Sequence, residues 1–457
     1  FVMRAILGGL LALALPLAAA ATPLTTQQQR DIDASVGEWL AETGAPSVSI
    51  AVVNGGEIAY AKAYGQARLT PRQPATPETR YAIDSISKEF TAAAMLKLQE
   101  EGKLSLDDKV AKYFPDLASA DKVTLRQILS HTAGYRDYWP QDFVTIEMGR
   151  PTTTRAVLDE WAKKPLDFAP GSDWQYSNTG FVIAGAIVEK VSGQPLVSFL
   201  KTNVFEPLHM AGVIDADQAR ADADAYTRWG NGPVRVAQKE GQGWLFAAGE
   251  LAMAPSELAR WDISLMNRSL LEPASYEALY TPIKLTSGRD SHYSLGLNVR
   301  DSHGQLQLSH GGGGSGFQST NRMWPAQKIA VIAFTNNDWA GPDAVADRVA
   351  FVVLPPTAAE ERARGVFKGF QDGSVDRTLF TENGNAYLSP AVIEDQKAGL
   401  GAFGPARTFE LVAEQSRGGL KTRTWRITTA NGAALIAVER GYPDGKLEQF
   451  MVSKDTY

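Results

Sequence analysis

The first candidate chemistry comes from the Ser-x-x-Lys tetrad at Ser85 and Lys88 and from a similar tetrad at Ser198 and Lys201. When such a tetrad is helical, its Ser and Lys lie on one face, with about 5–6 Å between their Cβ atoms. A partly buried Lys beside a hydroxyl loses affinity for its proton, and it can then act as, or support, the base that activates the Ser. Each tetrad is therefore a candidate nucleophile and base for acyl transfer.

The surroundings distinguish the two tetrads. Ser85 follows the apolar residues 81–83 and precedes the apolar run 90–96, which predicts a buried helix whose N-terminal N–H groups favour developing negative charge. Ser198 lies within residues 196–205, whose pattern predicts an amphipathic surface helix. Ser85 is the stronger candidate, although a simple N-cap role explains its local sequence equally well.

Two polar segments elsewhere in the chain offer matching groups. Tyr176 and Asn178 are two residues apart and follow the Pro-Gly turn at 170–171. His310 ends an alternating segment that predicts a strand, and the glycines at 311–314 come directly after it. Glycines let a strand approach a substrate closely, because no side chain intervenes. A phenol, an amide, an imidazole and backbone N–H groups are thus available to assist a nucleophile.

Composition and motif content exclude several other chemistries. The absence of Cys excludes thiol catalysis, disulfides, zinc–thiolate sites and iron–sulfur clusters. No G-x-S-x-G, Walker A or H-E-x-x-H motif occurs, and the G-x-G-x-x-G strings at 311–316 and 399–404 lack the strand-to-helix context of a dinucleotide site. The net charge of −6 argues against a nucleic-acid partner.

A group of acidic residues is the remaining metal candidate. Its members are Asp215, Asp217, Asp222 and Asp224. A calcium-binding loop would need Gly and Glu at the places where this sequence has Arg220 and Tyr226. We therefore interpret the group as a solvated surface loop, and we expect neither a metal nor any other cofactor.

The elements that must position these groups form one large α/β domain, residues 22–355. A helix is predicted over 26–40, and a hairpin follows with strands at 47–53 and 58–64. The middle of the domain, 85–290, is mostly helical in pattern. Later segments predict four more strands and a helix, at 293–300, 305–310, 317–323, 329–335 and 343–353. The sheet is thus assembled from both ends of the domain, and the cleft beside its helical insertion is the default site.

The composition changes near residue 355. Two prolines and a polar run predict a linker at 356–365. Beyond it, residues 366–457 are Gly-rich with alternating segments, which predicts a small all-β domain. Its turn signals lie at 383–384, 431–432 and 443–445. This domain is a candidate surface for forming a homo-oligomer, a lid or a substrate selector, and the sequence does not choose among them.

The first 21 residues predict a secretory signal peptide. Arg4 supplies a positive flank, residues 5–17 are apolar, and the alanines at 18–21 offer a cleavage site. The apolar run is too short for a comfortable membrane span, and no later segment reaches the roughly 18 apolar residues of a transmembrane helix. We therefore expect an exported protein, periplasmic or secreted, without a transmembrane anchor.

The chain resembles the serine β-lactamase and penicillin-binding-protein superfamily in three motifs, which occur in the family order: Ser85-x-x-Lys88, Tyr176-x-Asn178 and His310-x-Gly312. The likeness is to the class C β-lactamase, esterase and D-aminopeptidase branch. It covers residues 25–355, and the phrases at 101–108, 129–135 and 205–208 look familial too. It implies a β-lactamase-like antiparallel sheet flanked by helices, with an all-helical subdomain, and it does not securely extend to the C-terminal domain.

The resemblance also implies an acyl-enzyme mechanism. Ser85 would attack a carbonyl, with Lys88 and Tyr176 sharing the role of general base because a nearby ammonium eases ionisation of a phenol. Asn178 would bind a substrate oxygen and steady Lys88, while the backbone N–H groups of Ser85 and Gly313 hold the oxyanion. The expected activity is that of a serine hydrolase acting on a small-molecule or peptide substrate.

The third motif bears on the substrate. Many family members carry Lys-Thr-Gly where this chain has His310-x-Gly312, and their Lys anchors the carboxylate of penicillins or D-Ala-D-Ala ends. His310 is mostly neutral near pH 7, because a histidine has a reference pKa of about 6.5. This favours an ester, an amide or a D-amino-acid peptide as substrate. Two alternatives stay open: a β-lactamase or D-Ala-D-Ala carboxypeptidase, and a non-catalytic acyl-binding sensor. His131, in the phrase at 129–135, is interpreted as a structural turn residue.

Overall fold

The computed structural model of the protein describes residues 23–141, 143–302 and 305–455. The chain divides into two compact units, and the second contains Leu354 and the residues after it. The predicted signal peptide, residues 1–21, lies outside the described residues. In the part of the chain that is described, no helix has the length and apolar character needed to cross a membrane.

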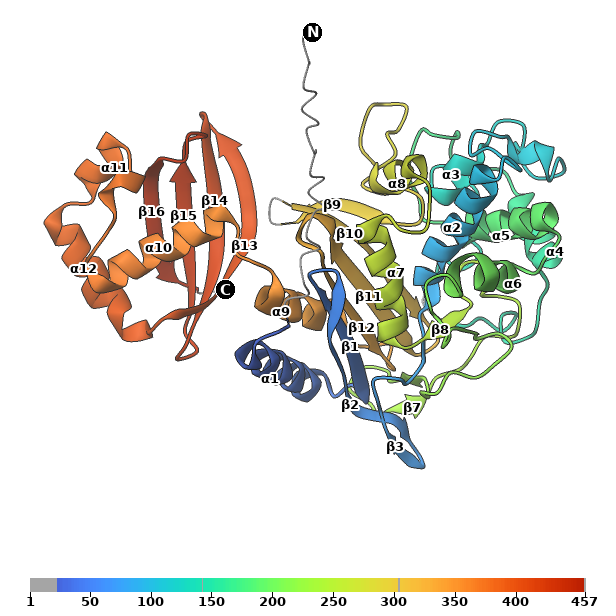
Figure 1. Ribbon diagram of the computed structural model, residues 1–457, viewed down its shortest axis with the longest axis horizontal. Helices are drawn as coiled ribbons and strands as arrows, with labels where there is room; N and C mark the ends of the chain where they lie inside the picture. Colours follow the sequence, from blue (N-terminus) through green and yellow to red (C-terminus); the bar gives the residue numbers. More distant parts are fainter. Residues whose placement is uncertain (1–22, 142, 303–304, 456–457) are drawn as a thin grey trace, which may run out of the picture. The chain divides into compact units, whose positions relative to one another are not determined.

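A seven-stranded sheet forms the framework of the first unit (Figure 1). Its strands are β1 (Ser47–Asn54), β2 (Glu57–Leu69), β3 (Arg72–Pro74), β9 (Asn298–Ser302), β10 (Gln305–Gly314), β11 (Phe317–Trp324) and β12 (Ile329–Thr335). Their spatial order is β3-β2-β1-β12-β11-β10-β9, and the pairings from β3 to β10 are antiparallel. The sheet is assembled from both ends of the unit, which confirms the sequence prediction.

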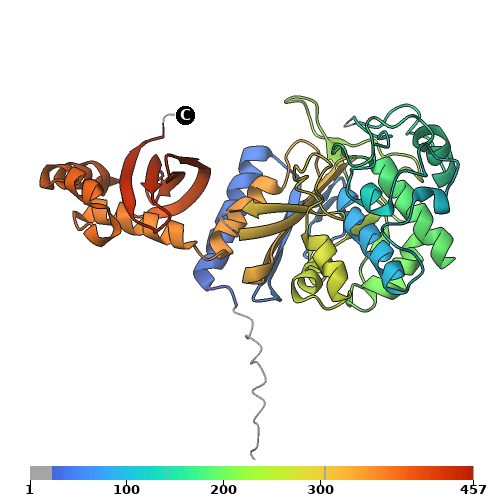
Figure 2. The same ribbon diagram turned by 90° about the horizontal axis from the view of Figure 1, so that it is seen from above.

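Helices cover both faces of this sheet. α7 (Pro255–Asn267) packs on one face, while α9 (Asp343–Val353) and α1 (Thr26–Thr43) lie on the other (Figures 1 and 2). The two central strands, β1 and β12, are consequently buried along almost their whole length. Burial on both faces explains why β12 is an unbroken apolar run in the sequence.

The first helix forms where its sequence predicts it. Thr25 and Gln28 make a capping box at its start, and Gly44 ends it in the left-handed conformation, with φ 65°. Its buried residues are Ile32, Val36 and Trp39. Their spacing of four and three residues places them on one face of the helix, which is the face that packs on the unit.

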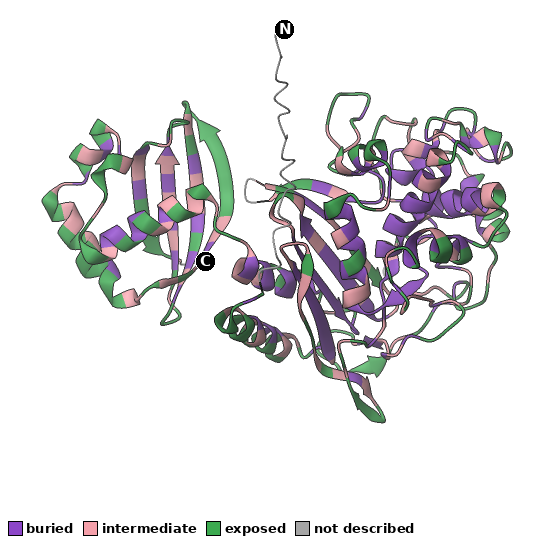
Figure 3. Ribbon diagram, viewed as in Figure 1, coloured by how far each residue is buried: buried purple, intermediate pink, exposed green. Residues whose placement is uncertain are grey.

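The helical insertion supplies the second half of the first unit. Its helices include α2 (Ser87–Glu100), α3 (Leu125–Leu129), α4 (Thr154–Val157), α5 (Asn178–Ser192), α6 (Leu196–Leu200) and α8 (Pro273–Tyr280). Residues 87–96 of α2 are all buried, and α2 packs against α5 and α6 (Figure 3). A helix that is enclosed on all sides belongs to the core rather than to the surface.

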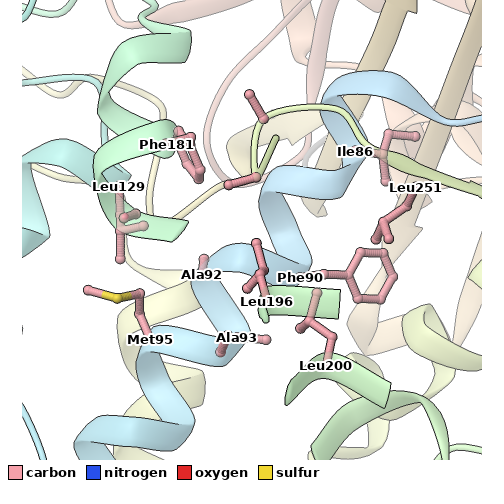
Figure 4. Close-up of a cluster of buried hydrophobic side chains, with 14 of the residues drawn as sticks. Ile86, Phe90, Ala92, Ala93, Met95, Leu129, Phe181, Leu196, Leu200 and Leu251 are labelled. Carbon is pink, nitrogen blue, oxygen red and sulfur yellow. The ribbon is translucent and has the colours of Figure 1, made fainter. Parts of the chain in front are cut away.

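Apolar packing holds α2 in place. Phe90 lies among Ile86, Leu200 and Leu251 (Figure 4), and its ring centroid is 5.0 Å from that of Trp261. Truncation of such a buried Phe typically costs about 3–5 kcal/mol. The residues at the start of α2 are therefore carried by a rigid, well-packed element.

Two small sheets complete the first unit. Their strands are β4 (Tyr81–Ala82), β5 (Ile214–Asp215), β6 (Tyr226–Thr227), β7 (Arg235–Val236) and β8 (Leu251–Met253). β4 and β5 flank β8 in one sheet, and β6 pairs with β7 in the other. β4 leads into the 3₁₀ turn η1 (Asp84–Ile86), which opens directly into α2. The pairing of β4 with β8 therefore fixes how the chain enters α2.

The second unit contains three helices and a four-stranded antiparallel sheet. Its elements are α10 (Ala358–Asp372), α11 (Glu382–Tyr387), α12 (Pro390–Leu400), β13 (Ala406–Arg417), β14 (Leu420–Thr429), β15 (Ala434–Gly441) and β16 (Leu447–Lys454). The strands pair in chain order, and the turns predicted at 431–432 and 443–445 join the last three of them. These strands and turns confirm the predicted antiparallel sheet.

The linker predicted at 356–365 is wrong. Thr357 caps α10, so the helix occupies most of that segment. The buried apolar face of α10 consists of Ala363, Val366, Phe367 and Phe370. This stripe extends across the predicted boundary, and the first two turns of the helix contain only alanines and charged residues. The turn predicted at 383–384 lies inside α11, and the unit therefore adds helices to the predicted strands.

Candidate active site

Ser85 and Lys88 lie at the junction of η1 and α2. The buried Lys88 donates hydrogen bonds through Nζ to Ser85 Oγ at 2.9 Å and to the Ala248 carbonyl at 2.8 Å. Ser85 is half-buried, and it does not cap α2, whose N-cap residue is Ile86. The structure therefore contradicts the N-cap interpretation of Ser85. Ser198, in the second tetrad, is exposed on α6 as predicted.

The surroundings of Lys88 make it a candidate base. Burial lowers the pKa of Lys88 to about 7, because the ammonium loses its hydration, while the carboxylates of Asp137 and Asp84 act in the opposite direction. Near neutral pH, a large fraction of Lys88 is thus an uncharged amine. Such an amine can accept the proton of the adjacent Ser85 hydroxyl.

Tyr176 completes the cluster from another part of the chain. It lies two residues before α5, and its ring centroid is 4.9 Å from Lys88 Nζ. Burial raises the pKa of Tyr176 above its usual value of 10, although the hydrogen bond with the Ser85 side chain lowers it somewhat. Burial of this phenol therefore acts against the easier ionisation that the nearby Lys88 was expected to give. The structure brings the hydroxyl, the amine and the phenol together.

Asn178 is held by a carboxylate that the sequence analysis missed. Its Nδ2 donates to Asp137 Oδ1 at 3.1 Å and to Oδ2 at 3.3 Å, and its backbone N–H donates to Oδ1 at 3.1 Å. Among the described residues, the hydrogen bonds of Asn178 go to Asp137 and not to Lys88, contrary to expectation. Asp137 instead acts on Lys88 through its charge. No motif or spacing marks Asp137 in the sequence, since only the fold brings it to this place.

His310 is buried on β10, and both of its ring nitrogens form hydrogen bonds. Its Nδ1 donates to the Gly311 carbonyl at 2.6 Å, so that Nε2 accepts the hydroxyl of Tyr293 at 2.8 Å. Burial, together with the nearby charge of Lys88, lowers the pKa of His310 to about 3. The imidazole is therefore neutral, as the sequence indicated. Tyr293, its partner, carries no sequence signal that would have identified it.

The glycines of β10 allow this strand to pass close to the nucleophile. A Cβ atom on Gly312 would lie 2.0 Å from the Ile83 carbonyl oxygen, and one on Gly314 would lie 2.9 Å from Asp84 Oδ1. A Cβ atom on Gly313 would meet nothing within 4 Å. β10 thus runs directly beside residues 83–84, which places Gly313 next to the segment that carries Ser85.

Asp84 is a second acidic residue that the sequence analysis missed. It has a left-handed backbone, with φ 46°, and is buried with no hydrogen-bond partner for Oδ2. Burial raises the pKa of Asp84 to about 8, and the negative charge of Glu240 acts in the same direction. Strain and an unpartnered buried carboxyl are costly, and such costs concentrate at functional sites. Asp84 therefore belongs to the electrostatic surroundings of the nucleophile.

The acidic group does not lie on a solvated loop as predicted. Oxygens of Asp215, Asp217 and the buried Glu250 lie within 4.8 Å of one another, while Asp222 and Asp224 form ion pairs with arginines elsewhere. Backbone N–H groups already occupy part of this set, as Gly243 donates to Asp217 at 3.0 Å. Acidic side chains in proximity do not by themselves define a metal site.

The sequence matches the family model described as Beta-lactamase over residues 29–353. This match spans most of the chain, and the protein therefore belongs to the beta-lactamase family, whose members are serine hydrolases of a common fold. The superfamily resemblance and the β-lactamase-like fold predicted from the three motifs are both confirmed.

Individual relatives agree with the family assignment. Penicillin-binding protein 4* of Bacillus subtilis is 26% identical over 318 residues, which are 66% of this chain and 70% of that protein. The first curated relatives are covered over 64–70% of their own length. A D-stereospecific amidohydrolase from Streptomyces sp. has a TM-score of 0.61 at 26% identity, covering 71% of this chain and 99% of that one. The octameric penicillin-binding protein homologue from Pyrococcus abyssi shares the fold over 93% of this chain and 99% of its own, with a TM-score of 0.64 at 21% identity.

Proposed function

We propose that the protein is an exported serine hydrolase that forms an acyl-enzyme on Ser85 and cleaves an ester, an amide or a D-amino-acid peptide bond. The observation that carries this proposal is the 2.9 Å hydrogen bond between Ser85 Oγ and the buried amine of Lys88. The lowered pKa of that amine, which follows from its burial, supports the assignment of Lys88 as general base. Membership of the beta-lactamase family supports the same class of reaction.

The proposed reaction uses groups that the structure brings to one place. Ser85 Oγ attacks the carbonyl carbon, and its proton passes to Lys88 Nζ. The backbone N–H groups of Ser85 and Gly313 stabilise the oxyanion. The tetrahedral intermediate then expels the alcohol or amine, which takes a proton from Lys88, either directly or through the Tyr176 hydroxyl. Because burial raises the pKa of Tyr176, its phenol stays protonated and acts as a donor in this step. Water finally hydrolyses the acyl-enzyme and restores Ser85.

The charge distribution favours substrates that lack a carboxylate. His310 is neutral because burial lowers its pKa, and both of its nitrogens are already hydrogen-bonded, so it offers no cation to an anionic substrate. Asp137, whose charge acts on Lys88, adds negative rather than positive charge to these surroundings. We propose that Gly312 and Asn178 contact the substrate through backbone and amide groups. The D-stereospecific amidohydrolase named above supports amides among the candidates.

A panel of substrates tests the proposal. Turnover of a p-nitrophenyl ester, a D-aminoacyl anilide and the β-lactam nitrocefin is compared for the wild-type protein, Ser85→Ala and Ser198→Ala. We expect turnover of the ester or the anilide that Ser85→Ala abolishes and Ser198→Ala leaves unchanged, because Ser198 lies exposed in the second tetrad. Nitrocefin as clearly the best substrate would instead support the alternative function.

That alternative is a β-lactamase or a D-Ala-D-Ala carboxypeptidase. The name of the Bacillus subtilis relative, penicillin-binding protein 4*, favours it. Stoichiometric acylation of Ser85 by penicillin at low concentration would support it. A non-catalytic acyl-binding sensor would instead be labelled at Ser85 by a fluorophosphonate and turn over no substrate in the panel.

Two further proposals concern the whole protein. The predicted signal peptide at residues 1–21 supports a periplasmic or secreted location. The Pyrococcus abyssi homologue, described as octameric, spans nearly the whole of this chain, and this supports a homo-oligomer that uses the C-terminal unit. We propose no nucleic-acid partner and no cofactor for the reaction.

A further inference from the structure

His131 occupies an unusual position directly after α3. It is buried, and its backbone is left-handed, with φ 60°. Residues other than glycine adopt this conformation uncommonly, although asparagine, aspartate and histidine do so more often than the rest. The backbone alone therefore does not explain the histidine, and the contacts of its side chain point to a further role.

His131 holds the chain on both sides of Tyr176. Its backbone carbonyl accepts the N–H of Gln175 at 3.0 Å, and its Nδ1 accepts the N–H of Ser177 at 3.1 Å. Its ring centroid lies 4.2 Å from that of Tyr176. One residue thus fixes the backbone before Tyr176, the backbone after it and the face of its ring.

The same ring connects Tyr176 with the third motif. The centroid of His131 is 4.8 Å from that of Tyr293, whose hydroxyl donates to His310. It is also 5.3 Å from that of Phe181 on α5. Burial and the nearby Lys88 lower the pKa of His131 well below 6.5, so the ring stays neutral. His131 is therefore the centre of an aromatic cluster that joins two of the three motifs.

The surroundings of the His131 ring are unfavourable for the stability of the fold. Because Nδ1 accepts a hydrogen bond, the proton of the neutral ring resides on Nε2. Nε2 is buried and has no hydrogen-bond partner. A strained backbone and an unpartnered buried donor at one residue are typical of sites where the structure serves function rather than stability.

We propose that His131 is a positioning residue that fixes the phenol of Tyr176 relative to Ser85 and Lys88. The proposal rests on the proposed function, in which Tyr176 passes a proton at Ser85. Loss of the Nδ1 acceptor would free the N–H of Ser177 and let Tyr176 shift. A displacement of about 1 Å at a reacting group can cost about 100-fold in rate.

Two substitutions of His131 distinguish the effect of losing the Nδ1 acceptor from the effect of losing the volume of the ring. His131→Asn keeps an acceptor, because Asn Oδ1 replaces Nδ1 at the same distance along the side chain, and Asn tolerates the left-handed backbone. His131→Leu keeps comparable volume and removes the acceptor. We expect His131→Leu to lower kcat about 100-fold with little change in KM, and His131→Asn to retain most of the wild-type kcat.

Matched controls come from His209, which is exposed and also has a left-handed backbone, with φ 57°. His209→Leu and His209→Asn should both leave kcat unchanged. Each rate is divided by the number of sites that a fluorophosphonate labels, so that only folded protein counts. A wild-type kcat per labelled site in His131→Leu would overturn the proposal.

A double-mutant cycle with Tyr176→Phe separates this proposal from the proposed function. If His131 acts through Tyr176, His131→Leu should have little further effect on kcat in the Tyr176→Phe background. A large loss in Tyr176→Phe with none in His131→Leu would overturn the role of His131 alone. An unchanged kcat in Tyr176→Phe would remove the phenol from the proposed reaction and overturn both.

The wild-type protein provides a test that no folding defect can obscure. Imidazole ¹⁵N NMR of the five histidines, with His131 assigned by its loss in His131→Asn, reports which nitrogen carries the proton. We expect a protonated Nε2 and an unprotonated Nδ1. A protonated Nδ1 cannot accept the N–H of Ser177, and this result would overturn the proposal even if His131→Leu does not fold.

Discussion

At the scale of single residues, the chemistry depends on how Lys88 is surrounded. Within the described part of the chain, no carboxylate lies within ion-pair distance of Lys88, and its two hydrogen-bond acceptors, Ser85 Oγ and the Ala248 carbonyl, are neutral. A buried ammonium that is not paired directly with an anion is unfavourable, so the uncharged amine is stabilised. These surroundings make Lys88 a candidate base near neutral pH.

The first prediction concerns the pH dependence of the reaction. We expect kcat/KM for an activated ester to rise with pH through about 7, because burial lowers the pKa of Lys88 to that value and the neutral amine is the base. A pH–rate profile from pH 5 to 9 measures this limb. Lys88→Arg keeps a permanent charge and should lower the rate by about 10²–10⁴-fold. A flat profile would mean that a different group accepts the proton.

The second prediction concerns Asp137. Its carboxylate raises the pKa of Lys88, so Asp137→Asn should move the ascending limb to lower pH. The substituted side chain keeps an oxygen that can accept the N–H groups of Asn178 and Trp139, which makes the change mainly one of charge. Asp173→Asn, at an exposed position, serves as the control. A limb that stays in place or moves to higher pH would contradict this electrostatic role.

The sequence predicts the site residues that have fixed neighbours along the chain. Ser85 and Lys88 are three residues apart in one tetrad, and Tyr176 lies two residues before Asn178 in a recognisable motif. Asp137 and Asp84 could not be predicted, because they reach the site through the fold and a lone Asp carries no periodic signal. The protonation preference of Tyr176 was also out of reach, since it depends on burial.

At the scale of elements, a buried pair of carboxyl groups joins α2 to α7. Glu89 Oε2 accepts the indole N–H of Trp261 at 2.7 Å, and Asp262 Oδ1 accepts Nδ2 of Asn321 at 2.9 Å. The other oxygens of Glu89 and Asp262 are buried without a partner. Asn321 Oδ1 in turn accepts the backbone N–H of His310, so the network links α2, α7 and β10.

The third prediction follows from this pair. Burial raises the pKa of Asp262 to about 8 from 3.8, so the folded state holds a proton that the unfolded state releases. The stability that this proton supplies is complete below about pH 4 and is lost as pH rises through about 8. Asp262→Asn should therefore flatten the fall in unfolding free energy between pH 5 and 8, by on the order of 1–2 kcal/mol. Urea titrations at several pH values measure it, and an unchanged pH dependence would refute it.

The fourth prediction uses two neighbouring glycines of β10. Gly312→Ala places a methyl group 2.0 Å from the Ile83 carbonyl oxygen, so it should displace β10 and lower both stability and activity. Overpacking of this kind costs about 1–3 kcal/mol. Gly313→Ala meets open space, keeps its backbone N–H and should fold like the wild type. Thermal unfolding of both variants decides the matter, and equal stability would contradict the close approach of β10.

A helix is predicted correctly from the sequence where its apolar residues repeat at a regular spacing throughout its length. α1 is predicted well because its apolar residues repeat at helical spacing within one segment. α10 is missed because its first turns contain only alanines and charged residues, which resemble a linker, and its fully buried residues begin only at Ala363. Hydrophobic periodicity identifies a helix only where the segment contains several apolar residues at helical spacing.

At the scale of the whole molecule, the chain builds two units with separate cores. The second unit has its own cluster of buried aromatic and aliphatic residues, including Phe409, Trp425 and Phe450. It also buries Glu439 between Arg362 and Arg423, which is a specific polar contact within that core. None of the candidate catalytic residues belongs to it.

The fifth prediction addresses the role of the second unit. If the C-terminal unit mediates self-association, light scattering should give a mass that is a multiple of the single chain. Met451→Lys, on β16, places a charge on an exposed apolar position of that unit and should shift the mass toward the monomer. Ile146→Lys, at an exposed position of the first unit, is the control and should not. A monomeric wild-type protein at tens of micromolar would contradict the proposal.

The measurement that tests the central claim most directly is the mass of the intact protein after reaction with an acylating probe. Peptide mapping then locates the adduct. We expect one adduct per wild-type chain, on Ser85, with none in Ser85→Ala and an undiminished yield in Ser198→Ala. An adduct on another residue, or equal labelling of Ser85→Ala, would show that the hydroxyl beside Lys88 is not the nucleophile.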